Sequence, residues 1–388
     1  MPSNHNPWAR LREAREGRFM SLDELAAKVG TSRQLLYYYE TGKHRPRPET
    51  AARICGALNL PSEFFLMAGP EPEPSATFFR QFRSKVRAKH RAAVERLRLW
   101  VRDAVAAVEE RVVFPDQDIP NFHPPSDPRE LNDDQIERAA IALRDYWGFG
   151  NGAIREIVKL VENKGCIVVA NLFDPRIDMI DAFSWWSHKG RPFIVLGRRE
   201  GSGPRRIIDV AHELGHLILH RNIDKRFLEL NTDTHKLIEL QAFRFAGAFL
   251  MPAETFRRSA PTVTLDTLLM IKPQWFLSVQ AMLQRARDIN MIDGATFLRL
   301  RKLLVHRGWL KQEPGDQDIP VEEPRLFANA LLTLKKSEPQ SMAELRQRVG
   351  FYPQDFERYA GLDDKDLAAE SIPTFQPYAR DTSALRLL

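Results

Sequence analysis

The sequence His212-Glu213-Leu214-Gly215-His216 constrains this chain more than any other feature, because it sets two histidines four residues apart. On an α-helix such residues leave the same face one turn apart, so both imidazoles can reach one metal ion. Glu213 is offset by about 100° from His212, close enough to act on a water molecule at the metal without being a ligand. The spacing therefore predicts a metallopeptidase type of site, with zinc (Zn2+) as the cofactor.

The flanking residues predict that this helix is buried. Ile207, Val210, Leu214 and Leu217 recur with helical periodicity around the polar residues, which confines the histidines to a narrow stripe. The alternative is that the histidines are ordinary packed or surface groups. Because such a spacing seldom arises by chance, it favours a metal site.

A catalytic zinc normally has three protein ligands, so a third must be found. No later histidine completes an extended three-histidine motif. Glu239 lies 23 residues after His216, in a helix-period segment where it shares a face with Ala242, Phe243 and Ala246. A buried carboxylate needs a partner, and zinc would supply one. We expect Glu239 to be the third ligand; the alternative is a solvated glutamate near a helix start.

The same residues resemble the ImmA/IrrE metallopeptidase family over roughly residues 166–252. The motif helix up to His220, Glu239, and the sequence from Ala242 to Pro252 with its FA…LxMP pattern carry this resemblance. It implies an α+β, zincin-like domain in which the two motif histidines and Glu239 bind zinc. It also implies that Glu213 is the catalytic base.

Two further positions bear on what such a site does. Phe243 stands where the family usually has asparagine. If that asparagine orients a ligand, its absence argues against catalytic activity. His220 matches a histidine that is common in the family after the motif. Three roles are open for it: a donor behind a zinc ligand, a group that stabilises the transition state, or a packed residue near the favourable C-terminal helix dipole.

A small sheet is expected before the metal helix. Residues 166–170 form a short apolar run, which indicates a buried strand. Residues 181–187 and 191–197 flank a Ser-His-Lys-Gly sequence and therefore predict a hairpin.

This sheet also suggests where a substrate would bind. Peptidases of this zinc class bind substrate as a strand added to a sheet edge, and residues 191–196 are the expected edge. Trp185 and Trp186 are adjacent in one strand and must point to opposite faces, so at least one could be exposed as a groove wall. Packing on the other face of the sheet is the favoured alternative.

The first 69 residues predict a separate helical domain. Its short helical patterns are separated by Gly17, Gly30, Gly42 and Pro61. The patterns cover Trp8–Arg15, Ser21–Val29, Thr31–Glu40, Pro48–Leu58 and Ser62–Leu66. The tight turn at Gly30 suggests a helix-turn-helix, and Ser21 with Glu24 has capping-box spacing. The segment resembles the XRE-type helix-turn-helix family, with one departure: Leu22 stands where the family often has a phosphate-contacting glutamine.

In such domains the recognition helix reads base edges while flanking groups contact phosphates. Arg33 and Gln34 are therefore the expected base-reading residues. Thr31, Ser32, Tyr38, Lys43 and Arg45 are better placed for the DNA backbone. The alternative is a helical bundle used for protein contacts, but the accompanying positive charge favours double-stranded DNA.

The charge of the chain lies in its N-terminal part. Residues 1–113 hold 20 Lys and Arg against 13 Asp and Glu, a net charge of +7; since the whole chain carries +6, the rest sums to −1. Part of this excess follows the Pro-rich linker at residues 70–74, within a basic helical pattern over residues 80–108. Two interpretations of those basic residues are equally compatible with the sequence: they contact phosphates, or they form a helix face that is only solvated.

Two cysteines in 388 residues do not make a disulfide framework, so a reducing cytosol is expected. No apolar run is long enough to span a membrane, and the N-terminus lacks the apolar core of a signal peptide. After Pro252 helical patterns dominate, at residues 273–291 and 295–306. Residues 341–362 have a further helix-turn-helix-like spacing, for which packing or oligomerisation is favoured over DNA reading.

We therefore expect a multidomain, mainly α protein. Its domains are an XRE-type domain at residues 1–69, a linker and basic helix at 70–114, a peptidase domain at 115–260 and a helical region at 261–388. The expected function is a cytoplasmic, nucleoid-associated regulator, a homodimer on a double-stranded DNA operator, whose zinc endopeptidase domain cleaves a regulatory protein such as a repressor. The alternative is a transcription factor or antitoxin whose peptidase-like domain senses a ligand or partner without cleaving it.

Overall fold

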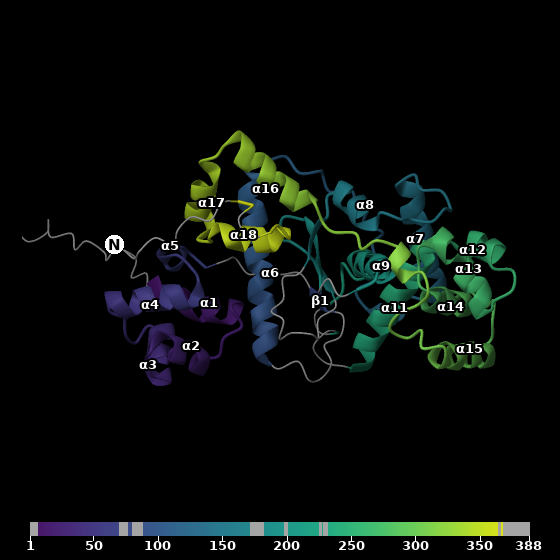
Figure 1. Cartoon of the computed structure of the whole chain (residues 1–388), viewed down its shortest axis with the longest axis horizontal. Coiled ribbons are helices and arrows are strands. Elements are labelled where there is room, and N and C mark those ends of the chain that lie inside the picture. Colours follow the sequence, from purple (N-terminus) through teal and green to yellow (C-terminus); the bar gives the residue numbers. More distant parts are fainter. Residues whose placement is uncertain are drawn as a thin grey trace, which may run out of the picture. The chain divides into compact units, whose positions relative to one another are not determined.

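The chain is a mainly α protein in which two compact units each have their own core. A computed structural model describes residues 7–69, 77–79, 88–170, 182–197, 201–224, 227, 232–363 and 366–367 (Figure 1). The N-terminal unit comprises Met1–Pro72, Ser84–Val113 and Asn329–Leu388, and the central unit comprises Glu73–Arg83 and Phe114–Ala328. The expected helical region at 261–388 is thus divided, with residues up to 328 in the central unit and the remainder in the N-terminal unit.

The N-terminal unit begins with the expected short helices. They are η1 (Pro7–Arg10), α1 (Leu11–Gly17), α2 (Leu22–Val29), α3 (Arg33–Glu40), α4 (Pro48–Leu58) and α5 (Ser62–Leu66). Ser21 caps α2 in a capping box with Glu24, as its spacing predicts. Gly30 then takes a left-handed conformation at φ 69°, which lets the chain turn tightly into α3. Helices α2 and α3 therefore form the predicted helix-turn-helix.

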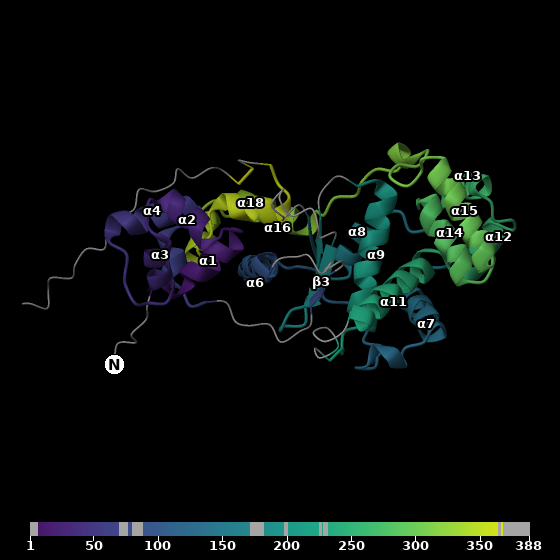
Figure 2. The ribbon, with the colours of Figure 1, turned by 90° about the horizontal axis from the view of Figure 1, so that it is seen from below.

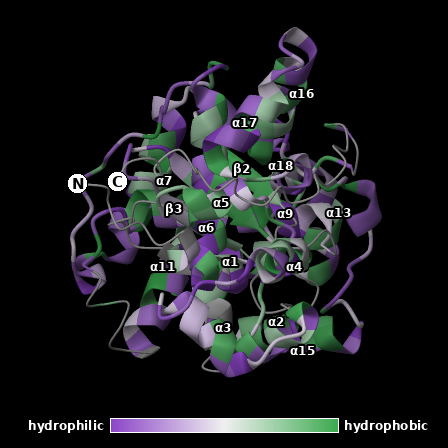
Figure 3. Ribbon diagram, turned by 90° about the vertical axis from the view of Figure 1, so that its left-hand side faces the viewer, coloured by the Kyte–Doolittle hydropathy of each residue, from purple (hydrophilic) through white to green (hydrophobic). Residues whose placement is uncertain are grey.

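Four further helices complete this unit. They are α6 (Ala88–Glu109), α16 (Leu326–Ser337), whose first residues belong to the central unit, α17 (Ser341–Val349) and α18 (Pro353–Ala360). Aromatic side chains join them to the helix-turn-helix domain, since Trp100 of α6 packs edge-on against Phe64 of α5 and also contacts Phe351. Figure 3 shows hydrophobic and hydrophilic residues on the same helices, such as α2, as expected for helices that pack on one face.

The C-terminal helices pack against the helix-turn-helix domain of their own chain. Arg18 forms two hydrogen bonds with Asp355 of α18, at 2.7 and 2.9 Å. Gly350, between α17 and α18, lies so close to α5 that a Cβ atom there would be 2.6 Å from the Cα atom of Phe64. The helix-turn-helix-like spacing around Gly350 thus serves intramolecular packing, the interpretation that the sequence favours.

The central unit contains a four-stranded sheet among its described residues. Its order is β1 (Thr77–Phe79), β3 (Ala182–Trp186), β4 (Pro192–Leu196), β2 (Ile167–Ala170). β3 and β4 form the predicted antiparallel hairpin, β4 and β2 are parallel, and β1 pairs antiparallel with β3.

One expectation about this sheet, its edge strand, is wrong, and the favoured interpretation of its tryptophans is confirmed. β4 is not an edge strand, because β3 and β2 use both of its sides. Trp185 and Trp186 are both buried: Trp185 stacks with Phe183 and Phe193, and Trp186 donates a hydrogen bond to the carbonyl of Leu217. Neither tryptophan can therefore form an exposed groove wall.

Helices build the rest of the unit. They are η2 (Pro128–Glu130), α7 (Asp133–Tyr146), α8 (Ile157–Asn163), α9 (Gly203–Leu219), α11 (Thr232–Leu250), α12 (Ala253–Ser259), α13 (Leu265–Trp275), α14 (Val279–Asp288), α15 (Gly294–His306) and η3 (Asp316–Asp318). Helix α11 packs against both α9 and α7 (Figure 2). No helix among the described residues is both long and apolar enough to span a membrane.

The helical pattern expected over residues 273–291 is interrupted in the structure. Pro273 lies inside α13, which ends at Trp275 because Phe276 has a positive φ of 58°. Ser278 then caps a new helix, α14, by accepting a hydrogen bond from the Ala281 amide. The break lets the chain reverse and pack α14 against α13.

Candidate metal centre

Helix α9 places the two motif histidines side by side in the core of the central unit. His212 and His216 are fully buried, and their Nε2 atoms lie 3.1 Å apart. Apolar residues such as Val210, Leu214 and Leu217 cover the helix around them. The i, i+4 spacing thus produces the shared face that the sequence predicts.

Helix α11 brings Glu239 to the same point. Its Oε2 atom lies 3.3 Å from His212 Nε2, and its Oε1 atom lies 3.5 Å from His216 Nε2. The three side chains offer ligand atoms that all lie within 4.8 Å of one another. A tetrahedral zinc ion with bonds of about 2.0–2.2 Å keeps its ligand atoms roughly 3.3–3.6 Å apart. The three separations of 3.1, 3.3 and 3.5 Å lie close to this range, so we keep all three residues as predicted ligands.

Glu213, the predicted base, is fully buried and held from outside its helix. The hydroxyl of Ser184 in β3 donates a hydrogen bond to Glu213 Oε2 at 2.7 Å. The same Ser184 Oγ lies 3.2 Å from the backbone carbonyl of Glu213. Because β3 packs directly on α9, the sheet fixes the orientation of this carboxylate.

His220 lies directly behind His216. The Nδ1 atoms of the two rings are 3.0 Å apart, and His220 Nε2 lies 3.1 Å from Gln241 Oε1. The Gln241 amide nitrogen donates to the carbonyls of Pro128 and Leu131, which leaves its oxygen to accept from His220 Nε2–H. His220 Nδ1 is then an acceptor, so His216 must carry its proton on Nδ1. This chain of hydrogen bonds keeps the lone pair of His216 Nε2 directed at the cluster.

Burial and neighbouring charge set the protonation of two of these groups. Burial, followed by the charge of nearby His216, lowers the pKa of His220 to about 3, so this imidazole stays neutral. For Glu239, burial favours the neutral acid, but the hydrogen bonds and charges of His212 and His216 outweigh it and lower the pKa below its usual value. A neutral imidazole and an ionised carboxylate are the forms that a zinc site requires.

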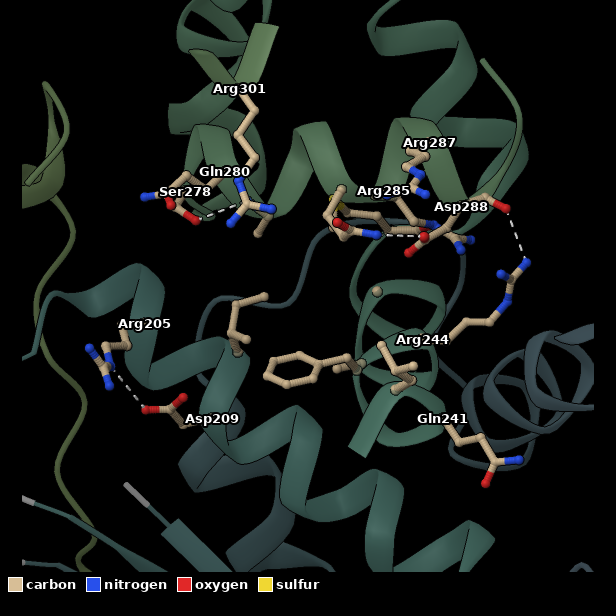
Figure 4. Close-up of a pocket in the computed structure, with 18 of the residues that line it drawn as sticks. Arg205, Asp209, Gln241, Arg244, Ser278, Gln280, Arg285, Arg287, Asp288 and Arg301 are labelled. Carbon is tan, nitrogen blue, oxygen red and sulfur yellow. Dashed lines mark hydrogen bonds and ion pairs between the residues drawn. The ribbon is translucent and has the colours of Figure 1, made fainter. Parts of the chain in front are cut away.

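Phe243, at the position where the resemblance implies asparagine, covers one side of the cluster. Its ring centroid lies 4.2 Å from that of His212. Phe243 is 38% exposed and also lines a pocket of about 1270 Å³ between α9, α11, α14 and α15. The labelled walls of this pocket include Arg205, Asp209, Gln241, Arg244, Ser278, Gln280, Arg285, Arg287, Asp288 and Arg301 (Figure 4). Phe243 thus contacts both a predicted zinc ligand and this pocket.

The predicted DNA-contacting residues lie at or near the surface of the helix-turn-helix. Ser32, Arg33 and Gln34 are exposed at the start of α3, and Thr31 and Tyr38 are partly exposed. Ser32 caps α3 through the Leu35 amide, and Gln34 donates to the Tyr38 hydroxyl at 2.8 Å. Lys43 and Arg45 are exposed in the loop after α3, with Lys43 above the Tyr38 ring. These positions are compatible with the predicted base and phosphate contacts.

The basic residues of the connector follow a different pattern. Arg98 is buried and pairs with Glu95 at 2.8 Å, and Arg96 lies 3.3 Å from Glu16 of α1. The Arg96 pair joins α6 to α1, and the Arg98 pair lies within α6; both side chains are thus engaged inside the N-terminal unit and are poor candidates for phosphate contacts. Residues 80–87 of the same basic pattern lie outside the described residues.

Two residues of the centre escape sequence reasoning. Ser184 lies 29 positions before Glu213 in a strand whose other residues are apolar or aromatic, and Gln241 is two positions after Glu239. A polar residue in an otherwise apolar buried strand was the available signal for Ser184. For Gln241 the signal was an amide on the inner side of a helix, but only the fold shows that His220 is its partner.

Comparison with known families agrees with this geometry. Residues 170–287 match the family described as the IrrE N-terminal-like domain, a peptidase family, and residues 11–65 match a helix-turn-helix family. The predicted fusion of an XRE-type domain to an ImmA/IrrE-like domain is thereby confirmed. No curated protein matches the chain.

Proposed function

We propose that this chain is a DNA-binding regulator with a zinc-dependent endopeptidase domain that cleaves another regulatory protein. The observation that supports it best is the cluster of His212, His216 and Glu239, next to a base that Ser184 holds in place. Both histidines of this group are fully buried, and Glu239 is largely so. The group has the ligands and the adjacent carboxylate that peptide hydrolysis requires.

In this proposal each residue of the centre has a defined task. The three ligand side chains would hold zinc, which when bound supplies a Lewis acid that polarises the scissile carbonyl. The Glu213 carboxylate accepts a proton from the attacking water and then donates it to the departing amine. Ser184 restricts the rotation of that carboxylate, and the surrounding apolar residues exclude other water from the site.

The helix-turn-helix domain gives the peptidase a location. Arg33 and Gln34 would read bases of a double-stranded operator, while Lys43 and Arg45 would contact phosphates. We infer a homodimer on paired half-sites, because helix-turn-helix domains of this kind commonly bind DNA as dimers. A peptidase fixed beside a promoter would find its substrate among proteins bound there, and a repressor is the natural candidate.

Cleavage of proteins encoded beside this gene tests the proposal. Each is incubated with zinc-loaded wild type or the Glu213→Gln variant, and mass spectrometry identifies the fragments. The proposal predicts a defined cut by wild type and a loss of turnover of several orders of magnitude in the variant. Equal cleavage by both would contradict the role of Glu213.

A second function is supported by the position of Phe243. Its ring packs on His212 and lines the pocket, so a small molecule bound there would touch the metal centre without being cleaved. A regulator of this kind would sense a ligand and need no general base. In cells, a Glu213→Gln strain that responds normally to the inducing signal would favour this sensor; a strain locked in the uninduced state would favour the peptidase.

A further inference from the structure

The outermost strand of the central sheet comes from the linker at residues 73–83, which belongs to the central unit and connects α5 to α6 along the chain. β1, at Thr77–Phe79, follows the Pro-rich sequence at residues 70–74 and precedes α6. It pairs antiparallel with β3, while β4 occupies the other side of β3. The linker therefore completes the sheet at the position where an edge would otherwise be open.

The register of this pair brings the linker close to the candidate active site. Phe78 is the pairing partner of Ser184, and the Ser184 hydroxyl donates to Glu213 Oε2. The backbone of the linker thus runs alongside β3, next to the residue that orients the predicted base. An extended peptide added to this side of β3 would pass the same point.

We propose that this side of β3 is a strand-docking surface for extended polypeptides, and that residues 77–79 of the same chain are its resident occupant. An incoming strand must displace the linker before it can pair with β3. The inference rests on the proposed function in one respect, since it takes the incoming strand to be the peptidase substrate. Docking itself requires no turnover.

The structure explains why this place is occupied and why the occupant can leave. All five residues of β3 are buried, so unpaired backbone groups on its outer side would be costly. A pairing of only three residues is shorter than the usual five or six, and it offers few hydrogen bonds. Its attachment to the chain compensates, because a short tether gives an effective concentration in the millimolar range.

The packing of the N-terminal unit indicates that residues 77–79 occupy the docking surface and are not a substrate that the chain cuts in itself. Trp100 of α6, which follows the linker, donates a hydrogen bond to Glu13 of α1 at 2.7 Å. Gly17 of α1 lies against the same tryptophan. A cut within residues 77–79 would leave the helix-turn-helix domain attached to α6 by these contacts. Cleavage of the linker would therefore release nothing.

Binding of the linker peptide in trans tests the proposal. The probe is a fluorescent peptide with the sequence of residues 74–82, and its affinity is measured by anisotropy with the full chain. The double variant Thr77→Pro/Phe78→Pro loses two neighbouring backbone N–H groups. Neighbouring N–H groups of a strand point to opposite sides, so one of the two lost groups faces β3. The matched control, Thr77→Ala/Phe78→Ala, keeps both N–H groups. We expect the proline variant to bind the probe at least about tenfold more tightly than wild type, and the alanine control much less so.

Equal affinity for wild type and the proline variant would overturn the proposal, and so would an absence of binding to both. If the proline variant does not fold, a Gly-Ser segment of equal length in place of residues 73–83 serves the same purpose. Intact-mass analysis provides a further check, because a wild-type chain that cuts itself within residues 77–79 is not holding a resident occupant. Since binding needs no catalysis, a failure of the peptidase proposal would leave this result interpretable.

The activity of the zinc-loaded protein provides a second readout. With β-casein as an unstructured substrate, the proline variant should cleave several times faster than wild type, and the alanine control should stay near wild type. Faster cleavage in the alanine control alone would contradict a docking mode based on the backbone.

Discussion

At the scale of single residues, the metal centre depends on the side chains behind the ligands as well as on the ligands themselves. Ser184 orients Glu213 from a strand, and Gln241 orients His216 through His220. Each of these contacts is buried. When one partner is removed, water therefore cannot take its place as the hydrogen-bond partner of the other. Substitutions at these positions should therefore impair the centre and also cost about 1–3 kcal/mol of stability.

Ser184→Ala should lower kcat about tenfold with little change in KM, because the Glu213 carboxylate loses its fixed orientation while substrate binding is kept. Zinc content should stay at the wild-type level. Ser187→Ala is the matched control, since its buried hydroxyl on the same hairpin accepts from the Arg191 amide and lies away from the base. A similar loss of kcat in both variants would show that Ser184 acts only through the stability of the hairpin.

Gln241→Leu should weaken zinc binding by about 10–100-fold. The change removes the acceptor of His220 Nε2–H, so His216 is no longer held in the tautomer that presents Nε2 to the metal. Competition with a chelator of known affinity measures the effect. A zinc affinity equal to that of wild type would rule out the proposed hydrogen-bond chain.

The sequence was informative about the ligands and much less so about their supports. Two histidines at i and i+4 must share a helix face, and Glu239 belongs to a face of small apolar residues that suits a buried carboxylate. Those patterns are local, so they can be recognised without a fold. Ser184 meets Glu213 only because β3 packs on α9, and no local pattern contains that information.

At the scale of secondary structure, Glu162 of α8 and Glu322, which precedes α16, each cap the start of a helix in a distant segment. Glu322 accepts from the Val158 and Lys159 amides at the start of α8. Glu162, within α8, accepts from the Arg325 and Leu326 amides at the start of α16. The arrangement satisfies backbone donors at both helix N-termini and joins two segments that are far apart in the chain.

Glu162 should make the protein less stable as the pH rises. Burial raises the pKa of its carboxyl to about 7, against the opposing hydrogen bonds from Leu326 and Arg325. Because the folded state binds this proton more tightly than the unfolded state, its contribution is fully present near pH 4.5 and is lost by about pH 7. Glu162→Gln keeps an acceptor that does not titrate. Urea unfolding at pH 5 and at pH 8 measures the effect. Between these two pH values the free energy of unfolding should fall in wild type by about 2 kcal/mol more than in the variant. Equal decreases in the two proteins would contradict this role.

The order of the strands could not be predicted for a related reason. Residues 191–196 had the composition of a strand near the metal helix, but an edge is defined by what lies beside it. The strand that closes the sheet, β1, comes from a linker whose Pro-rich and charged neighbours give little strand signal. Its partner β3 lies more than 100 residues away along the chain. Long-range pairing of this kind is set by the completed fold.

At the scale of the whole molecule, the two ends of the chain combine in one unit. Helices α17 and α18 pack on the helix-turn-helix domain through Arg18 and Asp355, through Glu63 and Arg346, and through Gly350. Sequence patterns predicted these helices but could not assign them to a unit, because the assignment depends on contacts across about 300 residues. The DNA-binding domain therefore depends on the C-terminal segment for part of its core.

Gly350→Ala should open this packing. A Cβ atom there would collide with Phe64, in addition to the strain of a side chain at φ 72°. Gly361→Ala is the matched control, since Gly361 ends α18 at φ 68° and has no atom within 4 Å of its Cβ position. The control should cost about 1 kcal/mol and Gly350→Ala about 1–3 kcal/mol more. Hydrogen exchange of α5 amides in the full chain measures the difference; equal exchange in both variants would show that α17 and α18 do not hold α5.

The zinc content of the purified full chain tests the central claim most directly, by atomic emission on wild type, Glu213→Gln, His216→Ala and Glu239→Ala. If His212, His216 and Glu239 hold the metal and Glu213 acts beside it, wild type and Glu213→Gln should each bind about one zinc per chain. His216→Ala and Glu239→Ala should bind almost none, because each leaves two protein ligands. A full zinc complement in His216→Ala would contradict the metal centre and the peptidase function built on it.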